Sequence, residues 1–392
     1  MSDKDKSVKK SPNLRFPGFQ NSWKILKLRD ISKRVNEKNT NNYLDLVFSN
    51  SAVQGIVLQN DYFEKSIANK NNLQGYYIVK PLDFVYNPRI SANAEVGAMN
   101  INNTFKTGLV SPLYTVFRIN STKVLHQFLE IYFKSKHWHH HMREIANYGA
   151  RDDRMNIKND DFYDMDLQIP QIDEQIKITS FLSKIILKIE TQKKTISELE
   201  KYIQILRDEL FSQKIRFNNH LNEHFPKWSE QKLEDICEKQ SSSISANSIE
   251  DNIGEFPIFG ATGFLKNIDF YQVESEYIAI IKDGAGVGRM LYCKEKSSVL
   301  GTLDILKAKD VNLQFLFYLL SRIDFSKYST GSTIPHIYFK DYKNEKVMVP
   351  CVDEQNRIAT FLSKLSEKIL IESKIMNLLK QQKKYLLQNL FI

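Results

Sequence analysis

The chain has 392 residues, which is too long for one small compact core. Of these residues 42% are hydrophobic and 26% charged, a composition that excludes a largely disordered chain. A formal net charge of +9 favours polyanionic partners, nucleic acid first among them. Three cysteines without a CxxC pair, a polar N-terminus and the lack of a long apolar run predict a cytoplasmic protein without disulfides, a cysteine-rich zinc site or a membrane span.

The chain is predicted to alternate globular segments with long helices. The expected segments are a flexible tail over 1–15, a globular segment over 16–169, a helix over 170–217, a globular segment over 218–349 and a helix over 350–392. Within the globular segments, strands are predicted over 43–48, 75–79, 114–119 and 277–281, and helices over 123–133 and 312–321. The fold class we expect is therefore α+β, with two similar mixed domains.

The second half of the chain repeats the first. Leu167-Gln-Ile-Pro170 followed by Asp173-Glu-Gln175 returns 180 residues later as Val347-Met-Val-Pro350 followed by Asp353-Glu-Gln355. Near the start of each half, Trp23 with Leu28-Arg-Asp-Ile31 returns 205 residues later as Trp228 with Leu233-Glu-Asp-Ile236. Because the offset falls from 205 to 180, the first globular segment is about 25 residues longer than the second.

Both long helices carry an apolar seam whose steps of three and four residues average the coiled-coil period. The core positions, which also mark the expected partner-subunit surface, are Leu182, Ile189, Ile196, Ile203 and Leu210 in the first helix and Leu362, Ile369, Met376, Leu379 and Leu390 in the second. Polar Gln192, Glu372 and Lys383 interrupt the seam. A duplicated unit favours an antiparallel pair with a pseudo-two-fold axis, in a rod about 60 Å long. The alternative is two separate amphipathic helices, each packed on its own domain.

The motifs that would indicate an enzyme are incomplete. Asp283-Gly-Ala-Gly-Val-Gly288 lacks the GxGxxG spacing and precedes a strand, so a hairpin turn is the better interpretation. His137-Trp-His-His-His141 has no acidic partner at ligand spacing, and no phosphate-binding NTPase loop occurs. We therefore expect no catalytic centre, no metal and no cofactor bound by this chain.

Polar and basic residues in glycine-containing loops are the candidates for DNA contact. Arginine and lysine can bind guanine, asparagine can bind adenine, and hydroxyl groups can bind phosphate. The candidates are Arg89, Asn93, Lys106, Arg151, Arg154 and Lys158 in the first globular segment, and Lys282, Arg289, Ser332, Thr333, His336 and Lys340 in the second.

The doubled Leu/Val-x-Ile/Val-Pro-x-Ile/Val-Asp-Glu-Gln element before a long helix resembles the specificity subunits of Type I restriction–modification systems. So do the Phe-Pro, Trp and Leu-x-Asp-Ile elements that open each half. The resemblance implies two target-recognition domains that read the halves of a split site in double-stranded DNA. It also implies paired helices that set the gap and dock two modification subunits, which methylate adenine with S-adenosylmethionine. Restriction subunits that use ATP and magnesium would complete an endonuclease.

One departure and two alternatives stand beside this resemblance. Gly149-Ala-Arg151 in the first half matches Thr330-Gly-Ser332 in the second, so Arg151 has no counterpart. Because the two domains differ in length and loop residues, we expect an asymmetric target. A coiled-coil scaffold and a stand-alone DNA-binding regulator are the competing functions, and an enzyme acting alone would require a site at the Gly284 loop or the histidine cluster.

Overall fold

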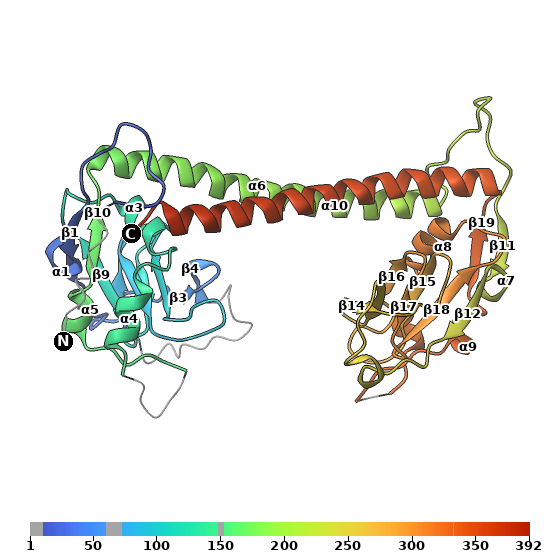
Figure 1. Ribbon diagram of the computed structural model, residues 1–392, viewed down its shortest axis with the longest axis horizontal. Coiled ribbons are helices and arrows are strands. Elements are labelled where there is room, and N and C mark those ends of the chain that lie inside the picture. Colours follow the sequence, from blue (N-terminus) through green and yellow to red (C-terminus); the bar gives the residue numbers. More distant parts are fainter. Residues whose placement is uncertain (1–10, 60–72, 148–152, 332) are drawn as a thin grey trace. The chain divides into compact units, whose positions relative to one another are not determined.

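The computed structural model describes residues 11–59, 73–147, 153–331 and 333–392 (Figure 1). The chain forms two compact units, Met1–Gln192 with Ile375–Ile392, and Lys193–Lys374. Each unit mixes strands and helices, and two long helices, α6 (Ile172–Phe211) and α10 (Val352–Asn389), each contribute to both units. This arrangement confirms the predicted fold class.

The first unit is built on a four-stranded antiparallel sheet of order β2-β9-β6-β7. Its strands are β2 (Ser32–Arg34), β9 (Thr115–Ile119), β6 (Phe84–Asn87) and β7 (Ala98–Ile101). Three two-stranded sheets pair β1 (Lys24–Lys27) with β10 (Asp166–Ile169), β3 (Phe48–Ser51) with β4 (Gly55–Leu58), and β5 (Tyr77–Val79) with β8 (Gly108–Val110). The short helices are α1 (Leu28–Ile31), α3 (His126–Tyr132), α4 (His139–Ile145) and α5 (Asn159–Tyr163).

The second unit repeats this plan with a sheet of order β12-β18-β15-β16. Its strands are β12 (Cys237–Ser241), β18 (Leu303–Ala308), β15 (Tyr277–Ile281) and β16 (Met290–Cys293). A two-stranded sheet pairs β11 (Ser229–Lys232) with β19 (Lys346–Val349), and a three-stranded sheet contains β14 (Gly263–Ile268), β13 (Phe256–Gly260) and β17 (Ser298–Val299). The helices are α7 (Leu233–Ile236), η2 (Asn247–Ile249), α8 (Leu313–Leu320), η3 (Phe325–Tyr328) and α9 (Phe339–Tyr342).

Strand register makes the two sheets comparable residue by residue. In the first unit Phe117 pairs with Arg34 on one side and Phe84 on the other. In the second unit Leu306 pairs with Lys239 and Ile278 in the same way. Since Arg34 and Lys239 are separated by the sequence offset of 205, Phe84 and Ile278 occupy equivalent positions.

The long helices pack against the globular core in both units. In the first unit Leu182, early in α6, shares a hydrophobic core with Leu390, at the end of α10. In the second unit Leu210, at the end of α6, shares a core with Leu362, early in α10. In each unit the beginning of one helix therefore lies with the end of the other, as in an antiparallel pair. The alternative of two helices that each pack only on their own domain is wrong.

All ten predicted seam residues are at least half-buried. Leu182, Ile196, Leu210, Leu362, Leu379 and Leu390 are buried, and Ile189, Ile203, Ile369 and Met376 are intermediate. Among the described residues, no helix is both long and apolar enough to span a bilayer.

The strand expected over 43–48 is wrong except for its last residue, where β3 begins at Phe48. The side chain of Asn39 explains the difference, because its Oδ1 accepts from the Leu44 amide and its Nδ2 donates to the Leu44 carbonyl. These backbone groups are thereby taken from a strand ladder. The expectations over 114–119, 277–281 and 312–321 agree with β9, β15 and α8 to within a residue or two.

The Asp-Glu-Gln element anchors the start of each long helix. Glu174 and Glu354 are buried, and each accepts two hydrogen bonds from one arginine: Arg15 at 2.8 and 2.8 Å, and Arg216 at 3.1 and 2.7 Å. Trp228 also donates to Glu354, at 3.0 Å. Asp173 and Asp353 are exposed and place negative charge in the first turn of each helix, where it is favourable to the helix dipole.

The neighbouring glutamines are buried as well and fasten each long helix to its domain. Gln175 accepts from the Leu125 amide and donates to the Lys123 and Pro170 carbonyls, all at 2.9 Å. Gln355 accepts from the Asn312 amide at 2.8 Å and donates to the Pro350 carbonyl at 2.9 Å. The segments that precede α3 and α8 are thus tied to the starts of α6 and α10.

The expected tail over 1–15 is only partly described, because residues 1–10 lie outside the described residues. Leu14 donates its amide to the Asn389 carbonyl at 2.8 Å, and Arg15 holds Glu174. Both residues thus belong to the packed first unit rather than to a free tail.

We expect Arg216→Leu to lower the free energy of unfolding by about 3 kcal/mol, since it leaves the Glu354 carboxylate buried without its cation. Calorimetric unfolding of the full chain measures this loss. The double variant Arg216→Leu/Glu354→Gln removes the charge while keeping an oxygen for Trp228, so it should recover most of the loss. A loss below about 0.5 kcal/mol in the single variant would mean that the pair behaves as a surface ion pair.

Candidate nucleic-acid interface

In the first unit, two loops singled out by their sequence lie side by side. One connects β6 to β7 over residues 88–97, and the other precedes α5. The Met155 amide donates to the Pro88 carbonyl at 3.0 Å, and the Ile90 amide donates to the Asp153 carbonyl at 2.9 Å. These bonds join the loops next to the end of the central sheet.

The second unit joins the equivalent loops in the same way. The hairpin between β15 and β16 covers residues 282–289, which confirms that the glycine-rich segment is a turn between antiparallel strands. The Ile337 amide donates to the Lys282 carbonyl at 3.0 Å, and the Gly284 amide donates to the Pro335 carbonyl at 2.9 Å. Figure 1 shows α9, which follows this loop pair, on the side of its unit that faces away from the long helices.

The loop pair of the first unit presents two guanidinium groups. The Nε atoms of Arg89 and Arg154 each lie 3.9 Å from Oδ2 of Asp153, so one carboxylate is shared between two cations. The Tyr114 phenol lies close by, and burial raises its pKa although the two arginines act in the opposite direction. The Tyr114 hydroxyl therefore keeps its proton at neutral pH and can donate a hydrogen bond beside the arginines.

The loop pair of the second unit presents a histidine held by a carboxylate. Nδ1 of His336 lies 2.6 Å from Oδ1 of Asp283. The Tyr338 ring is nearly parallel to the imidazole, with 6.4 Å between centroids, and Lys340 Nζ lies 5.2 Å from the Tyr338 centroid. Aromatic, imidazole and ammonium groups thus line one exposed edge of this loop pair.

Glu95 holds the first hairpin loop, which also carries exposed Asn93, to the segment around α4. Its carboxylate accepts from Lys136 and from Arg143, the latter at 2.7 Å. The Lys136 hydrogen bond is the main cause of a lowered Glu95 pKa. His139 lies 4.0 Å away, but burial lowers its pKa to about 4, so it adds no charge at neutral pH.

The other predicted DNA-contact residues divide into four groups. Lys158, Thr333 and Lys340 are exposed beside the loop pairs. Lys282 instead forms a salt bridge of 3.1 Å with buried Asp304, and Arg289 folds over its own loop to donate to the Ala261 carbonyl at 3.2 Å. Lys106 lies at the other end of β6 and β7, where its carbonyl accepts from Asn102. Arg151 and Ser332 lie outside the described residues.

Sequence reasoning missed Asp283 as a partner of the candidate residue His336, because the sequence marks it only as the first residue of a glycine-rich turn. Strand register identifies it as the equivalent of Arg89. Asp283 lies five residues after Ile278, just as Arg89 lies five residues after Phe84, and Ile278 and Phe84 occupy equivalent positions in the two sheets. That relation depends on strand pairing and is not visible in the sequence.

The histidine cluster has structural contacts. Helix α4 starts at His139, so His137 and His141 do not share a helical face. His141 Nε2 lies 2.9 Å from the Asp161 carbonyl, and His140 contacts Glu144 at 3.0 Å. In the part of the chain that the structure describes, no group of three or more potential ligands could hold a metal ion.

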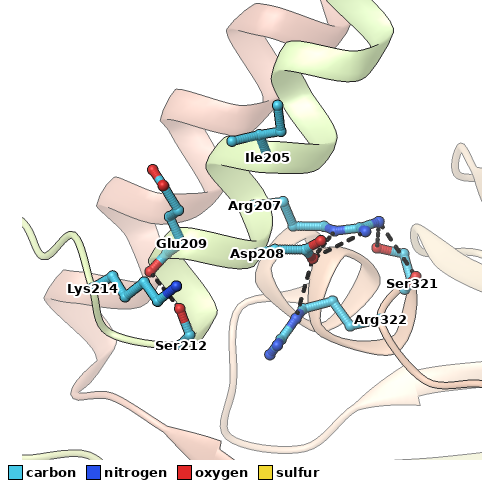
Figure 2. Close-up of a pocket in the computed structure, with 8 residues that line it drawn as sticks. All are labelled: Ile205, Arg207, Asp208, Glu209, Ser212, Lys214, Ser321 and Arg322. Atoms are coloured by element: carbon cyan, nitrogen blue, oxygen red, sulfur yellow. Dashed lines mark hydrogen bonds and ion pairs between the residues drawn. The ribbon is translucent and has the colours of Figure 1, made fainter.

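A charged pocket of about 570 Å³ lies in the second unit, between the last turn of α6 and the residues after α8 (Figure 2). Arg207 donates to Ser321 Oγ at 3.1 Å and contacts Asp208, which also lies 3.5 Å from Arg322. Because Arg207 and Arg322 both pair with Asp208, this pocket offers a poor site for an anion, and its lining residues lie outside the loop pair.

Comparisons with known proteins fit this architecture. Residues 226–381 match the family described as Type I restriction modification DNA specificity domain. A search of curated protein sequences found no match. A solved Type I restriction–modification S subunit from M. genitalium shares 17% identity, covers 97% of this chain and 99% of its own, and superimposes with a TM-score of 0.61.

A second solved chain comes from work on complex assembly and conformational transition of the type I R-M system. It shares 15% identity over 97% of this chain and 99% of its own, with a TM-score of 0.57. At these identities the likeness establishes the fold, while the family match covers the second globular domain and most of α10.

The chain is a duplicated protein in which each unit joins an equivalent pair of loops beside its central sheet. Residues 226–381 are similar to the Type I restriction modification DNA specificity domain, and the whole chain shares its fold with the solved S subunit.

We expect Glu95→Gln to speed hydrogen exchange of the backbone amides in residues 88–97. The substitution removes the carboxylate charge that binds Lys136 and Arg143, so the loop is held less firmly. Because the Glu95 pKa is lowered, the clamp should persist at neutral pH and be lost only as the pH falls through that lowered value. Glu144→Gln, an exposed change on α4 itself, is the matched control. Equal exchange in both variants and the wild type would show that the backbone bonds alone hold the loop.

Proposed function

We propose that this chain directs a Type I restriction–modification complex to a two-part, asymmetric target in double-stranded DNA. Each domain would read one half-site through its loop pair. The observation that carries the proposal is the presence of the same two joined loops in both domains, with Arg89 and Arg154 in one and Asp283 and His336 in the other. Different chemistry at equivalent positions favours two different half-sites.

The proposed gap between half-sites is set by α6 and α10. A helix of 40 residues is about 60 Å long, and half-sites on one face of DNA recur about every 34–36 Å. A helical pair of this length is long enough to set a gap of about one turn of DNA between half-sites. The apolar seam supports a fixed pairing of the helices.

The proposed partners are two adenine-methylating modification subunits, which use S-adenosylmethionine, and restriction subunits, which use ATP and magnesium. This chain would bind none of these cofactors itself. Exposed Ile371, Leu378 and Tyr385 recur every seven residues along α10 and support a protein partner on that face. Unpaired Cys237, Cys293 and Cys351 agree with action in the cytoplasm.

The proposed function is tested by mapping N6-methyladenine across the genome of cells that express this chain with its modification subunit. We expect a gapped, asymmetric motif that is absent from cells lacking the chain. The control is the same modification subunit with a different specificity chain. If that control yields its own motif and this chain yields none, the chain is a scaffold or has lost recognition.

We further expect that inserting four residues next to both Gln192 and Glu372 lengthens the gap and leaves both half-sites unchanged. Four helical residues add about 6 Å, close to two base-pair steps. The same methylation map reads out the new spacing. Inserting four residues into the exposed linker around His220 is the control, because it leaves the helices intact. Altered half-site bases with an unchanged gap would show that the helices do not measure it.

A further inference from the structure

Equivalent positions in the two loop pairs carry opposite hydrogen-bonding chemistry. Arg89 faces Arg154 in an isolated antiparallel bridge, and Asp283 faces His336 in a bridge of the same kind. Arg89 and Asp283 are equivalent by strand register. Arg154 and His336 are equivalent because each immediately precedes the residue that joins the two loops. That residue is Met155 in the first unit and Ile337 in the second, and its amide donates to the neighbouring hairpin loop.

The first domain offers donors at this position. A guanidinium group has five N–H donors and no acceptor. Among the described residues, Arg89 and Arg154 share the single carboxylate of Asp153 at 3.9 Å, so these three side chains together carry one net positive charge and more donors than that carboxylate can fill. Such a pair matches the O6 and N7 acceptors of guanine.

The second domain offers acceptors. An ionised carboxylate can only accept, so the hydrogen in the 2.6 Å contact between Asp283 and His336 resides on Nδ1. In the neutral imidazole, Nε2 then carries a lone pair. The side chains of His336 and Asp283 are 36% and 30% exposed, so both are partly open to a ligand. The matching groups on bases are the amino groups of adenine and cytosine.

The acceptor atom is held in place from several directions. The His336 amide donates to the Thr330 carbonyl, and the Thr330 amide donates to the His336 carbonyl, both at 2.8 Å. The imidazole lies nearly parallel to the Tyr338 ring, with 14° between their planes. With backbone and ring fixed, the partner of Nδ1 decides whether Nε2 accepts or donates.

We propose that His336, positioned by Asp283, reads an amino group of adenine or cytosine in the second half-site, whereas Arg89 and Arg154 read guanine at the equivalent place in the first. Asp283 is a positioning residue, and His336 touches the base. This inference rests on the proposed function and names the chemistry of one reading position within it.

The test maps the methylated motif directed by the full chain, with its modification subunit, for the wild type and for Asp283→Asn. The asparagine amide can donate to Nδ1, which moves the imidazole hydrogen to Nε2 and makes it a donor. We expect one position of the second half-site to change, on the strand that is read, from an amino-bearing base to the keto-bearing guanine or thymine. The first half-site should stay the same.

Two further variants keep the test decisive. His336→Ala should reduce discrimination at that position by about tenfold or more, the effect of losing one specific base contact. Arg154→Ala should relax only the first half-site. If the wild type directs no two-part motif, the proposed function itself fails. If it directs one, and His336→Ala and Asp283→Asn both leave the second half-site unchanged, only the present inference is overturned.

Discussion

A buried glutamate held by an arginine is the interaction on which each half of the structure depends. Glu174 and Glu354 lie in the first turn of a long helix, and Arg15 and Arg216 reach them from the segment that enters the globular domain. The adjacent glutamine binds the chain ahead of the next helix of that domain. A charge with so little access to water is tolerated only with a close partner, so the direction in which the helix leaves the domain is fixed.

Within this frame the central sheets support equivalent surfaces. The order β2-β9-β6-β7 recurs as β12-β18-β15-β16, and the hairpin loop after the third strand is joined to the loop before a short helix in both units. Backbone hydrogen bonds make this junction, so side chains there can vary without loss of the scaffold. Two domains of one architecture thereby carry different side chains at equivalent loop positions.

Several charged residues that look alike in sequence differ in the structure because of what surrounds them. Lys282 neutralises buried Asp304, whereas exposed Lys340 lies over the Tyr338 ring. Glu95 lies in a loop chosen for its basic and amide residues, yet it is the residue that clamps the loop to the helical layer. Composition indicates that a loop is polar, and only the neighbours decide which charges remain available to a ligand.

The sequence by itself determined the duplication, the mixed α+β class, the long helices and their seams. These features are periodic or repeated, and periodicity follows directly from helix geometry. The tertiary structure alone decided that each domain packs against both helices, that Asn39 takes the Leu44 backbone out of the expected strand, and that Asp283 replaces Arg89. Each of these depends on contacts between residues far apart in the chain or on strand register. The identity of one residue does not determine which distant residue it will contact.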